Sequence, residues 1–526
     1  MKRIFRLFVI FSLAAAVPAL YSCSDKNKIA VDDGDEKPGE GDEKPGEGDN
    51  KPGEGTDNPG EGGENEPPVA SEDAIRQFFL NELGSLKRYT DSGMDTYSAR
   101  DLVDVNDIES TQKRVWSLWK TANESFSEEK LISLTTFNDK TCLGSYSIPG
   151  ILEAKWTGDG SELIEGEIAK MVYYWGTSED PKPDCGYPAF IYLHGSGPVT
   201  NEWNTGKNLC YSDYVQAGPS AFLVPRIPNG FTRTDGFSLY RWWQKGKQYV
   251  WDKIIRQIFL GDSDIDPNRF FFFGISEGAY GSQRLASFYA DYLAGVGPIA
   301  GGEPLVNAPS ENSANIAFCL RTGSLDDSYG RNALTAAAKA DFERLQAAHP
   351  DYYDHKIDVV EGAYHGTANL LYYDTIPWLI NKTRKTNPKY VYWERLEQDG
   401  VYRRGFYNLY IPETEKPKER RCYEMTITGN TVDITVNKVS YTATAWESKH
   451  GMPIAYDKQY TAVSGGKLGI FLGSELVDLT QEVTININGK QAWKGVPELK
   501  VENLVNSCAL YYDPYRLYPA YVEVDL

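Results

Sequence analysis

Residues 266–278 read Asp-Pro-Asn-Arg-Phe-Phe-Phe-Phe-Gly-Ile-Ser-Glu-Gly, and this stretch decides the fold. The apolar run Phe270–Phe273 predicts a buried strand, and the residues after Gly278 have the pattern of a helix. A strand that turns sharply into a helix brings backbone against backbone, so glycine is needed at Gly274 and Gly278, where no Cβ fits comfortably. Ser276 between them is expected to be strained and exposed, as a nucleophilic serine in such a turn is.

A serine hydroxyl reacts only when a base takes its proton, and that base must be oriented by a carboxylate. His365 lies in the glycine-rich stretch Gly362–Thr367, after a predicted strand at Ile357–Val360, so it is the candidate base. The carboxylate is expected after the preceding strand, where Asp326 and Asp327 are neighbours. We favour Asp326 and keep Asp327 as the alternative, since one of the pair is expected to begin the following helix.

The anionic oxygen of the reaction intermediate needs two backbone N–H donors. One is expected from Glu277, the residue after the candidate nucleophile. The other is expected from the loop His194–Pro198, which follows the predicted strand Ala189–Leu193, and Ser196 is our choice within that loop. His194 is expected to hold the loop in place rather than to take part in catalysis.

Short apolar stretches between residues 151 and 386 alternate with longer amphipathic ones, a pattern typical of a parallel sheet covered by helices. This indicates a catalytic α/β domain over 151–388, after an N-terminal helical segment over 69–150. After residue 390 alternating runs replace the helical signal, which predicts a C-terminal β-sandwich-like domain over 389–526. The predicted central strands are Ala169–Trp175, Ala189–Leu193, Ala221–Val224, Phe270–Phe273, Ile316–Leu320 and Ile357–Val360.

From about Tyr187 to Ile380 the chain resembles the feruloyl esterase and polyhydroxyalkanoate depolymerase group, and more distantly the catalytic domain of prolyl oligopeptidases. The motifs that carry the resemblance are His194-Gly195, Asp266-Pro267-x-Arg269, Gly274-x-Ser276-x-Gly278 with Tyr280-Gly281, and His365-Gly366. The resemblance implies the α/β-hydrolase fold, and it gives the triad roles to the serine, the favoured aspartate and the histidine named above. The chain departs from the group at Glu277, where Met or Gln is common, and at Ala279, where a glycine is common.

The first six residues carry three basic side chains ahead of an apolar stretch, Leu7–Leu20, that is too short for a stable membrane span. Residues 1–22 are therefore expected to be a secretion signal. The sequence Leu20-Tyr21-Ser22-Cys23 is similar to the lipobox of bacterial lipoproteins, which implies cleavage before Cys23 and lipid attachment to it. We expect an outer-membrane lipoprotein, with an ordinary signal peptide as the alternative.

Residues 23–68 carry four near-copies of the unit Gly-Asp-Glu-Lys-Pro-Gly-Glu, so an extended acidic linker is expected. The formal net charge of −20 argues against nucleic acid or an anionic membrane surface as a partner, which leaves the lipid as the membrane contact. The triplet Asp262-x-Asp264-x-Asp266 lacks the glycine and the glutamate of a calcium loop. We expect no metal and no cofactor.

A lipid anchor on a long linker favours a bulky substrate outside the cell. Trp203 and Trp243 lie in stretches expected to border the site, and indole rings stack well on sugars or on a phenolic acyl group; core packing is the alternative. We therefore expect a carboxylic ester hydrolase that acts on feruloyl or acetyl esters of polysaccharides or oligosaccharides. A serine peptidase of the prolyl oligopeptidase type and a binding protein without turnover are the alternatives.

Overall fold

The computed structural model describes residues 67–526, except 86–94, 138–141, 157–162, 198, 229–240, 245, 261–263, 367–373, 414–416 and 418. The part from Pro67 to Leu526 forms one compact unit. The expected signal, Cys23 and nearly all of the acidic linker lie outside the described residues. None of the helices in the described ranges is both long and apolar enough to cross a membrane.

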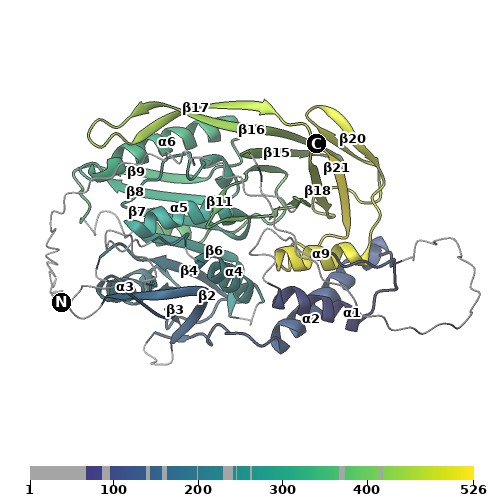
Figure 1. The fold of residues 1–526 in the computed structure, drawn as a ribbon, viewed down its shortest axis with the longest axis horizontal. Helices are drawn as coiled ribbons and strands as arrows, with labels where there is room; N and C mark the ends of the chain where they lie inside the picture. Colours follow the sequence, from purple (N-terminus) through teal and green to yellow (C-terminus); the bar gives the residue numbers. More distant parts are fainter. Residues whose placement is uncertain are drawn as a thin grey trace, which may run out of the picture. The chain divides into compact units, whose positions relative to one another are not determined.

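A mostly parallel sheet forms the centre of the fold, as the sequence predicts (Figure 1). Its strands are β1 (Thr135–Thr136), β2 (Leu143–Trp156), β3 (Leu163–Thr177), β4 (Tyr187–Leu193), β5 (Ala221–Pro225), β6 (Ile265–Ile275), β7 (Gly295–Ile299), β8 (Ala317–Gly323) and β9 (His355–Val360). They lie in the order β1-β3-β5-β4-β6-β7-β8-β9, and β2 pairs with β3. Every neighbouring pair from β5 to β9 is parallel, whereas β3 is antiparallel to both β2 and β5.

The strands β4 and β5 and the segment Phe270–Phe273 of β6 are apolar or aromatic because both faces of the sheet are covered there. On one face Phe272 packs edge-on against Trp251 of α4 (Lys247–Phe259), and α5 (Glu277–Tyr289) follows beside it. On the other face Phe271 stacks on Phe190 with ring centroids 4.5 Å apart, in a core that includes α3 (Val199–Asn208) and α8 (Thr375–Leu379). Successive side chains of β6 therefore enter different cores, as the alternation along a strand requires.

Two further sheets follow after residue 389, in agreement with the predicted C-terminal β structure. The larger sheet contains β10 (Tyr390–Glu394), β15 (Arg421–Thr428), β16 (Thr431–Trp446), β17 (Pro453–Ala462), β19 (Val483–Ile487) and β20 (Lys490–Gly495). The smaller sheet contains β13 (Gly405–Phe406), β14 (Leu409–Tyr410), β18 (Lys467–Leu472) and β21 (Ala520–Asp525). A separate two-stranded ribbon joins β11 (Glu397–Gln398) to β12 (Val401–Tyr402).

Helix α9 (Val501–Tyr511) corrects the expectation that helices end before residue 390. It packs against α1 (Glu72–Gly84) and α2 (Ile108–Ser125), the two helices of the predicted N-terminal segment. Eight of its eleven residues are buried, so its sequence lacks the polar face that makes a surface helix recognisable.

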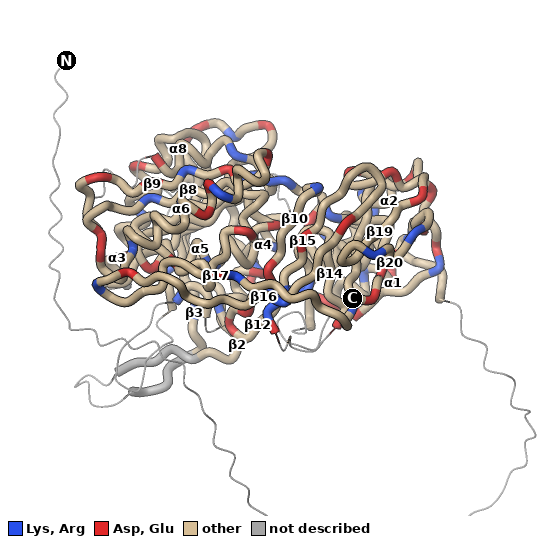
Figure 2. Tube along the Cα trace, turned by 90° about the horizontal axis from the view of Figure 1, so that it is seen from above, with Lys and Arg blue, Asp and Glu red and all other residues tan. Residues whose placement is uncertain are grey.

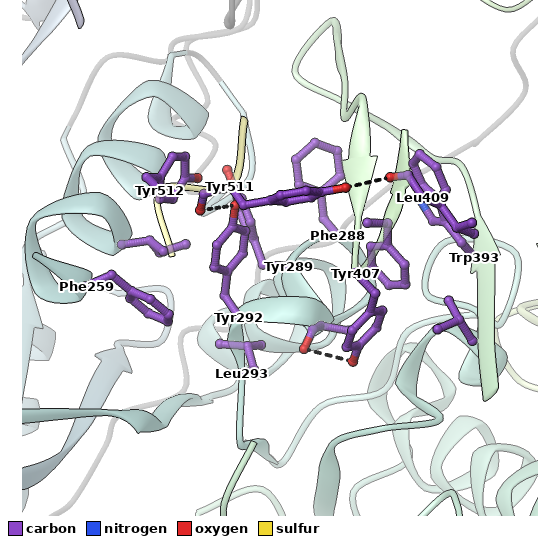
Figure 3. Close-up of a cluster of buried hydrophobic side chains, with 14 of the residues drawn as sticks. Phe259, Phe288, Tyr289, Tyr292, Leu293, Trp393, Tyr407, Leu409, Tyr511 and Tyr512 are labelled. Carbon is purple, nitrogen blue, oxygen red and sulfur yellow. Dashed lines mark hydrogen bonds between the residues drawn. The ribbon is translucent and has the colours of Figure 1, made fainter. Parts of the chain in front are cut away.

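The C-terminal strands share one core with the central sheet. Figure 3 shows aromatic rings from both parts around the carboxyl end of α5. Tyr292 stacks on Tyr512 with centroids 5.2 Å apart, and its hydroxyl donates a hydrogen bond to the carbonyl of Tyr511 (3.0 Å). The hydroxyl of Tyr511 in turn donates to the carbonyl of Leu409 (3.0 Å). Figure 2 shows acidic and basic positions interspersed over most of these elements.

Candidate active site

Ser276 occupies the turn between β6 and α5, with φ 55° and ψ −114°. A non-glycine residue with positive φ is strained, and such strain is found mainly where the surrounding structure enforces it. A Cβ at Gly278 would stand 1.9 Å from the carbonyl oxygen of Leu193, and one at Gly274 would stand 2.5 Å from the same oxygen. Both glycines are therefore required by the close approach of the turn to β4.

The structure brings Ser276, His365 and Asp326 together. The Nε2 atom of His365 lies 3.1 Å from Oγ of Ser276, and its Nδ1 atom lies 2.7 Å from Oδ2 of Asp326. Asp326 is buried, whereas the His365 side chain is 42% exposed. A histidine held in this way can take the serine proton while the aspartate fixes its ring and stabilises the imidazolium.

The two adjacent aspartates after β8 have different partners. Asp326 also accepts a hydrogen bond from Arg331 (2.9 Å), whose Nε donates to the hydroxyl of Tyr280 (3.0 Å). Asp327 lies at the surface, where Lys449 donates to it (2.6 Å) and lowers the pKa of its carboxyl. Asp326 is therefore the carboxylate within reach of His365. The catalytic roles of both residues remain predictions.

Backbone hydrogen bonds hold the loops of Asp326 and His365 together. The amide of Leu325 donates to the carbonyl of Ala363 (2.9 Å), and the amide of Gly362 donates to the hydroxyl of Ser324 (2.9 Å). These contacts join the end of β8 to the end of β9, its parallel neighbour. The distance between aspartate and histidine is thus set by the sheet and not by either loop alone.

The expected oxyanion donors lie on both sides of Ser276. Glu277 is the first residue of α5, and the first amides of a helix have no carbonyl partner within it. Ser196 is exposed in the turn after β4, and a Cβ at the adjacent Gly195 would stand 3.3 Å from Cβ of Ser276. Both residues therefore lie where the sequence places them, and their donor roles remain predictions.

His194 holds the turn after β4 through both ring nitrogens. Burial lowers its pKa to about 4, so the imidazole is neutral near pH 7. Nε2 accepts a hydrogen bond from the amide of Ile227 (3.1 Å), which leaves Nδ1–H to donate to the carbonyl of Gly195 (2.7 Å). The indole of Trp242 also donates to the carbonyl of His194 (3.1 Å). These contacts agree with the structural role expected for this histidine.

The side chain of Glu277 is buried behind the nucleophile turn. Its Oε2 accepts a hydrogen bond from Arg241 (2.5 Å), while its Oε1 has no hydrogen-bond partner among the described residues. Burial raises the pKa of this carboxyl to about 7, although Arg241 opposes the shift. Esterases of the resembled group commonly have Met or Gln at this position. Glu277 instead places a carboxyl with a pKa near neutrality beside its own backbone amide, which is the expected oxyanion donor.

Trp203 and Trp243 are both buried, and this corrects the expectation that they stack on substrate. The Nε1 atom of Trp203 donates to the carbonyl of Val224 (2.8 Å), and its ring stacks on Tyr174 with centroids 4.5 Å apart. The guanidinium of Arg284 lies 4.4 Å from the ring centroid of Trp243. Both indoles are thus buried and packed against protein groups. Core packing, the alternative for these residues, fits the contacts.

Glu202 is a site residue that the sequence analysis missed. It lies on α3, and a Cβ at Gly197 would stand 2.5 Å from its Oε1. Its carboxylate is therefore next to the turn that holds Ser196. The stretch around Trp203, which was expected to border the site, belongs to the helix α3. A lone glutamate in a polar stretch gives no sequence signal, because only the packing of α3 brings it to the turn.

The described residues contain neither a cluster of metal-ligating side chains nor a disulfide. Across the described ranges, no cluster of three or more His, Cys, Asp or Glu side chains is placed to hold a metal ion. The six described cysteines form no disulfide with one another, and five of them are buried. Cys185 is the exposed one, and Arg269 donates a hydrogen bond to its sulfur (3.2 Å).

No protein-family model matches the chain, and no curated protein matches it. Among solved structures, a thermostable esterase aligns with 45% of this chain at 20% identity and a TM-score of 0.30, and the match spans 64% of that esterase. A ferulic acid esterase from Anaeromyces mucronatus aligns with 48% of this chain and 94% of its own, at 13% identity and a TM-score of 0.29.

A feruloyl esterase module from Clostridium thermocellum, in complex with sinapinate, aligns with 49% of this chain and 97% of its own, at 14% identity and a TM-score of 0.28. These are distant and partial likenesses. The strand order of the central sheet and the strained serine between β6 and α5 are features of this chain itself. By these two features, the chain has the α/β-hydrolase fold.

Proposed function

We propose that this chain is a secreted serine hydrolase that cleaves carboxylic esters through an acyl-enzyme on Ser276. One observation carries the proposal: His365 lies within hydrogen-bond distance of Oγ of Ser276 and of Asp326, while Ser276 is strained in a turn that exposes its hydroxyl to reaction. A serine kept for packing alone would need neither the strain nor a partly exposed histidine held by a buried carboxylate.

The reaction follows from the positions of these groups. Oγ of Ser276 attacks the ester carbonyl carbon while Nε2 of His365 takes the hydroxyl proton, and the oxyanion accepts hydrogen bonds from the amides of Glu277 and Ser196. The intermediate collapses, the bond to the alcohol oxygen breaks, and His365 returns the proton to the leaving alcohol. Water then repeats the sequence on the acyl-enzyme, which releases the carboxylic acid and restores Ser276.

We further propose that the ester is a feruloyl or acetyl group on a polysaccharide or oligosaccharide. The expected lipid on Cys23 and the acidic linker support this, because they suit a polymer outside the cell better than a small metabolite within it. A peptidase of the prolyl oligopeptidase type usually carries a propeller as a filter before its hydrolase domain. Helices α1 and α2 precede the central sheet here instead.

Two measurements test the reaction class. Wild-type protein is expected to hydrolyse p-nitrophenyl acetate and to be labelled by a fluorophosphonate, and Ser276→Ala is expected to lose both properties. Hydrolysis at the wild-type rate by Ser276→Ala would refute the proposal. A wild-type protein that folds but neither turns over nor labels would instead be a binding protein on this fold.

Substrate and anchoring have separate tests. Release of ferulate or acetate from xylan-type oligosaccharides is expected to be faster than cleavage of proline-containing peptides, and the reverse order would favour the peptidase. Lipid attachment is expected to depend on the sulfur of Cys23, since two or three acyl chains hold a protein at a membrane where one does not. Cys23→Ser should therefore leave the membrane fraction, and its retention there would contradict the lipoprotein assignment.

A further inference from the structure

We propose that the carboxylate of Glu202 is a specificity-determining group that accepts hydrogen bonds from hydroxyl groups on the alcohol part of the substrate ester. The inference rests on the proposed ester hydrolysis at Ser276 and deepens it. It assigns the substrate class to esters of sugars or other polyols, in preference to esters of simple alcohols.

The first observation is the position of the carboxylate. A Cβ at Gly195 would stand 3.4 Å from Oε2 of Glu202 and 3.3 Å from Cβ of Ser276. The carboxylate and the candidate nucleophile therefore border the same small space beside this glycine. Burial raises the pKa of the Glu202 carboxyl, and the imidazole of His365 opposes that shift when it is protonated. Glu202 thus belongs to the surroundings of the scissile bond.

The second observation is that the helix carrying Glu202 is held firmly. The next residue, Trp203, is buried and hydrogen-bonded to the carbonyl of Val224 on β5. A Cβ at Gly206, one turn further along α3, would stand 2.1 Å from the ring of Tyr192 on β4. Helix α3 therefore lies directly on the sheet, and Glu202 projects from a fixed support rather than from a loop that could carry it away.

The third observation is that no donor among the described residues binds the carboxylate. No hydrogen bond or ion pair within that part of the chain engages Glu202. A partly buried carboxylate without a donor is unfavourable, and its negative charge opposes an oxyanion formed nearby. Hydroxyl groups of a bound polyol would satisfy the carboxylate and reduce that opposition, whereas a simple alcohol has no group to do so.

The test compares two esters that differ only in their donors. One is a methyl xyloside that carries a single acetyl group and free neighbouring hydroxyls, and the other is the same ester with those hydroxyls O-methylated. The ratio of kcat/KM for the first ester over the second is measured for wild type, Glu202→Ala and the isosteric Glu202→Gln. Asn204→Ala, at an exposed position of the same helix, is the matched control. p-Nitrophenyl acetate reports whether Ser276 is reactive in each protein.

For wild type, kcat/KM is expected to be roughly 10 to 100 times higher for the ester with free hydroxyls, because that is the effect of one hydrogen bond to a charged group. Glu202→Ala is expected to abolish this preference, Glu202→Gln to keep part of it through the amide oxygen, and Asn204→Ala to leave it unchanged. A ratio that stays at the wild-type value in both Glu202 variants, with p-nitrophenyl acetate still hydrolysed, overturns the inference. Failure of the wild type on p-nitrophenyl acetate overturns the proposed function itself, and this inference with it.

Discussion

The two ends of helix α5 hold charged and polar groups in opposite environments. At its amino end, the strained Ser276 contacts His365, whose side chain is 42% exposed and whose Nδ1 is hydrogen-bonded to Asp326. At its carboxyl end, Asp291 is bound by Arg403 and by Arg516 (2.5 Å), with Asp291 and Arg516 fully buried. One end combines a partly exposed histidine with a strained serine, and the other, which we call the sealed end, holds fully buried charges.

The sealed end joins the central sheet to the C-terminal strands. Arg516 also binds Asp513 (2.7 Å), which accepts a hydrogen bond from Arg384 (2.5 Å), and the rings drawn in Figure 3 surround this end of α5. Buried charges of this kind are fixed by partners from distant parts of the chain. The two ends therefore differ in exposure and in backbone strain, and a high density of charge does not by itself mark a candidate active site.

The largest effect is expected at the amino end. Ser276→Ala should lower kcat for p-nitrophenyl acetate by about 10⁴-fold or more, and His365→Ala should be as severe, because the triad residues act as a unit. Neither substitution should lower the free energy of unfolding by more than about 1 kcal/mol, since each removes atoms from a partly open site. Urea unfolding checks the second point, and retained activity in either variant would show that this end of α5 is not the reactive one.

The two neighbouring aspartates sharpen the comparison within the site. Asp326→Asn should lower kcat by about a thousandfold, less than the serine change, because it disturbs the histidine without removing the nucleophile. Asp327→Asn is the matched control, and it should change kcat by less than about threefold because it removes only a surface ion pair. If Asp327→Asn proves the damaging change, the choice of carboxylate is wrong.

At the sealed end, Asp291→Asn should act on stability and spare the reaction. Removing one partner of a buried ion pair leaves uncompensated charge, so the free energy of unfolding should fall by about 3–5 kcal/mol. Asp264→Asn, which breaks the exposed pair with Lys182, is the control and should cost less than about 1 kcal/mol. Urea unfolding measures both, and an Asp291→Asn protein that is as stable as wild type would contradict the structural role.

Two buried carboxylates, Glu277 on α5 and Asp291 just beyond it, should change the stability of the protein in opposite directions as pH varies. Burial raises the pKa of Glu277 from 4.5 to about 7 in the folded state, so its charged form is unfavourable there. The stability of wild type relative to Glu277→Gln should therefore fall as pH rises through this window. The change should be on the order of 3 kcal/mol, because one pKa unit corresponds to about 1.4 kcal/mol.

Burial also raises the pKa of Asp291, but Arg403 and Arg516 outweigh it and leave that pKa below its ordinary value of 3.8. The stability that Asp291 contributes should accordingly be present above this value and be lost as pH falls through the lower pKa of the folded state. Unfolding measured across both pH ranges checks the two signs. The same slope for Glu277→Gln and Asp291→Asn would contradict the difference between the two environments.

Much of the catalytic part can be predicted from sequence because its signals are local. The apolar run before Ser276, the glycines on each side of it and the turn around His365 are each encoded within a few residues. Six strands of the central sheet were predicted for the same reason, but β1, β2 and β7 were not. The short β7, with two glycines and a proline, carries too few apolar side chains to be recognised.

Only the tertiary structure decided the features that depend on distant parts of the chain. Asp326 and Asp327 are equivalent as sequence, and their separation comes from hydrogen bonds between the β8 and β9 loops and from Lys449 on the C-terminal hairpin. The burial of Trp203 and the approach of Glu202 to the turn before it both follow from how α3 packs on the sheet. The sequence thus determines the local turn that strains Ser276, because that turn depends on adjacent residues, whereas long-range packing selects the side chains that surround it.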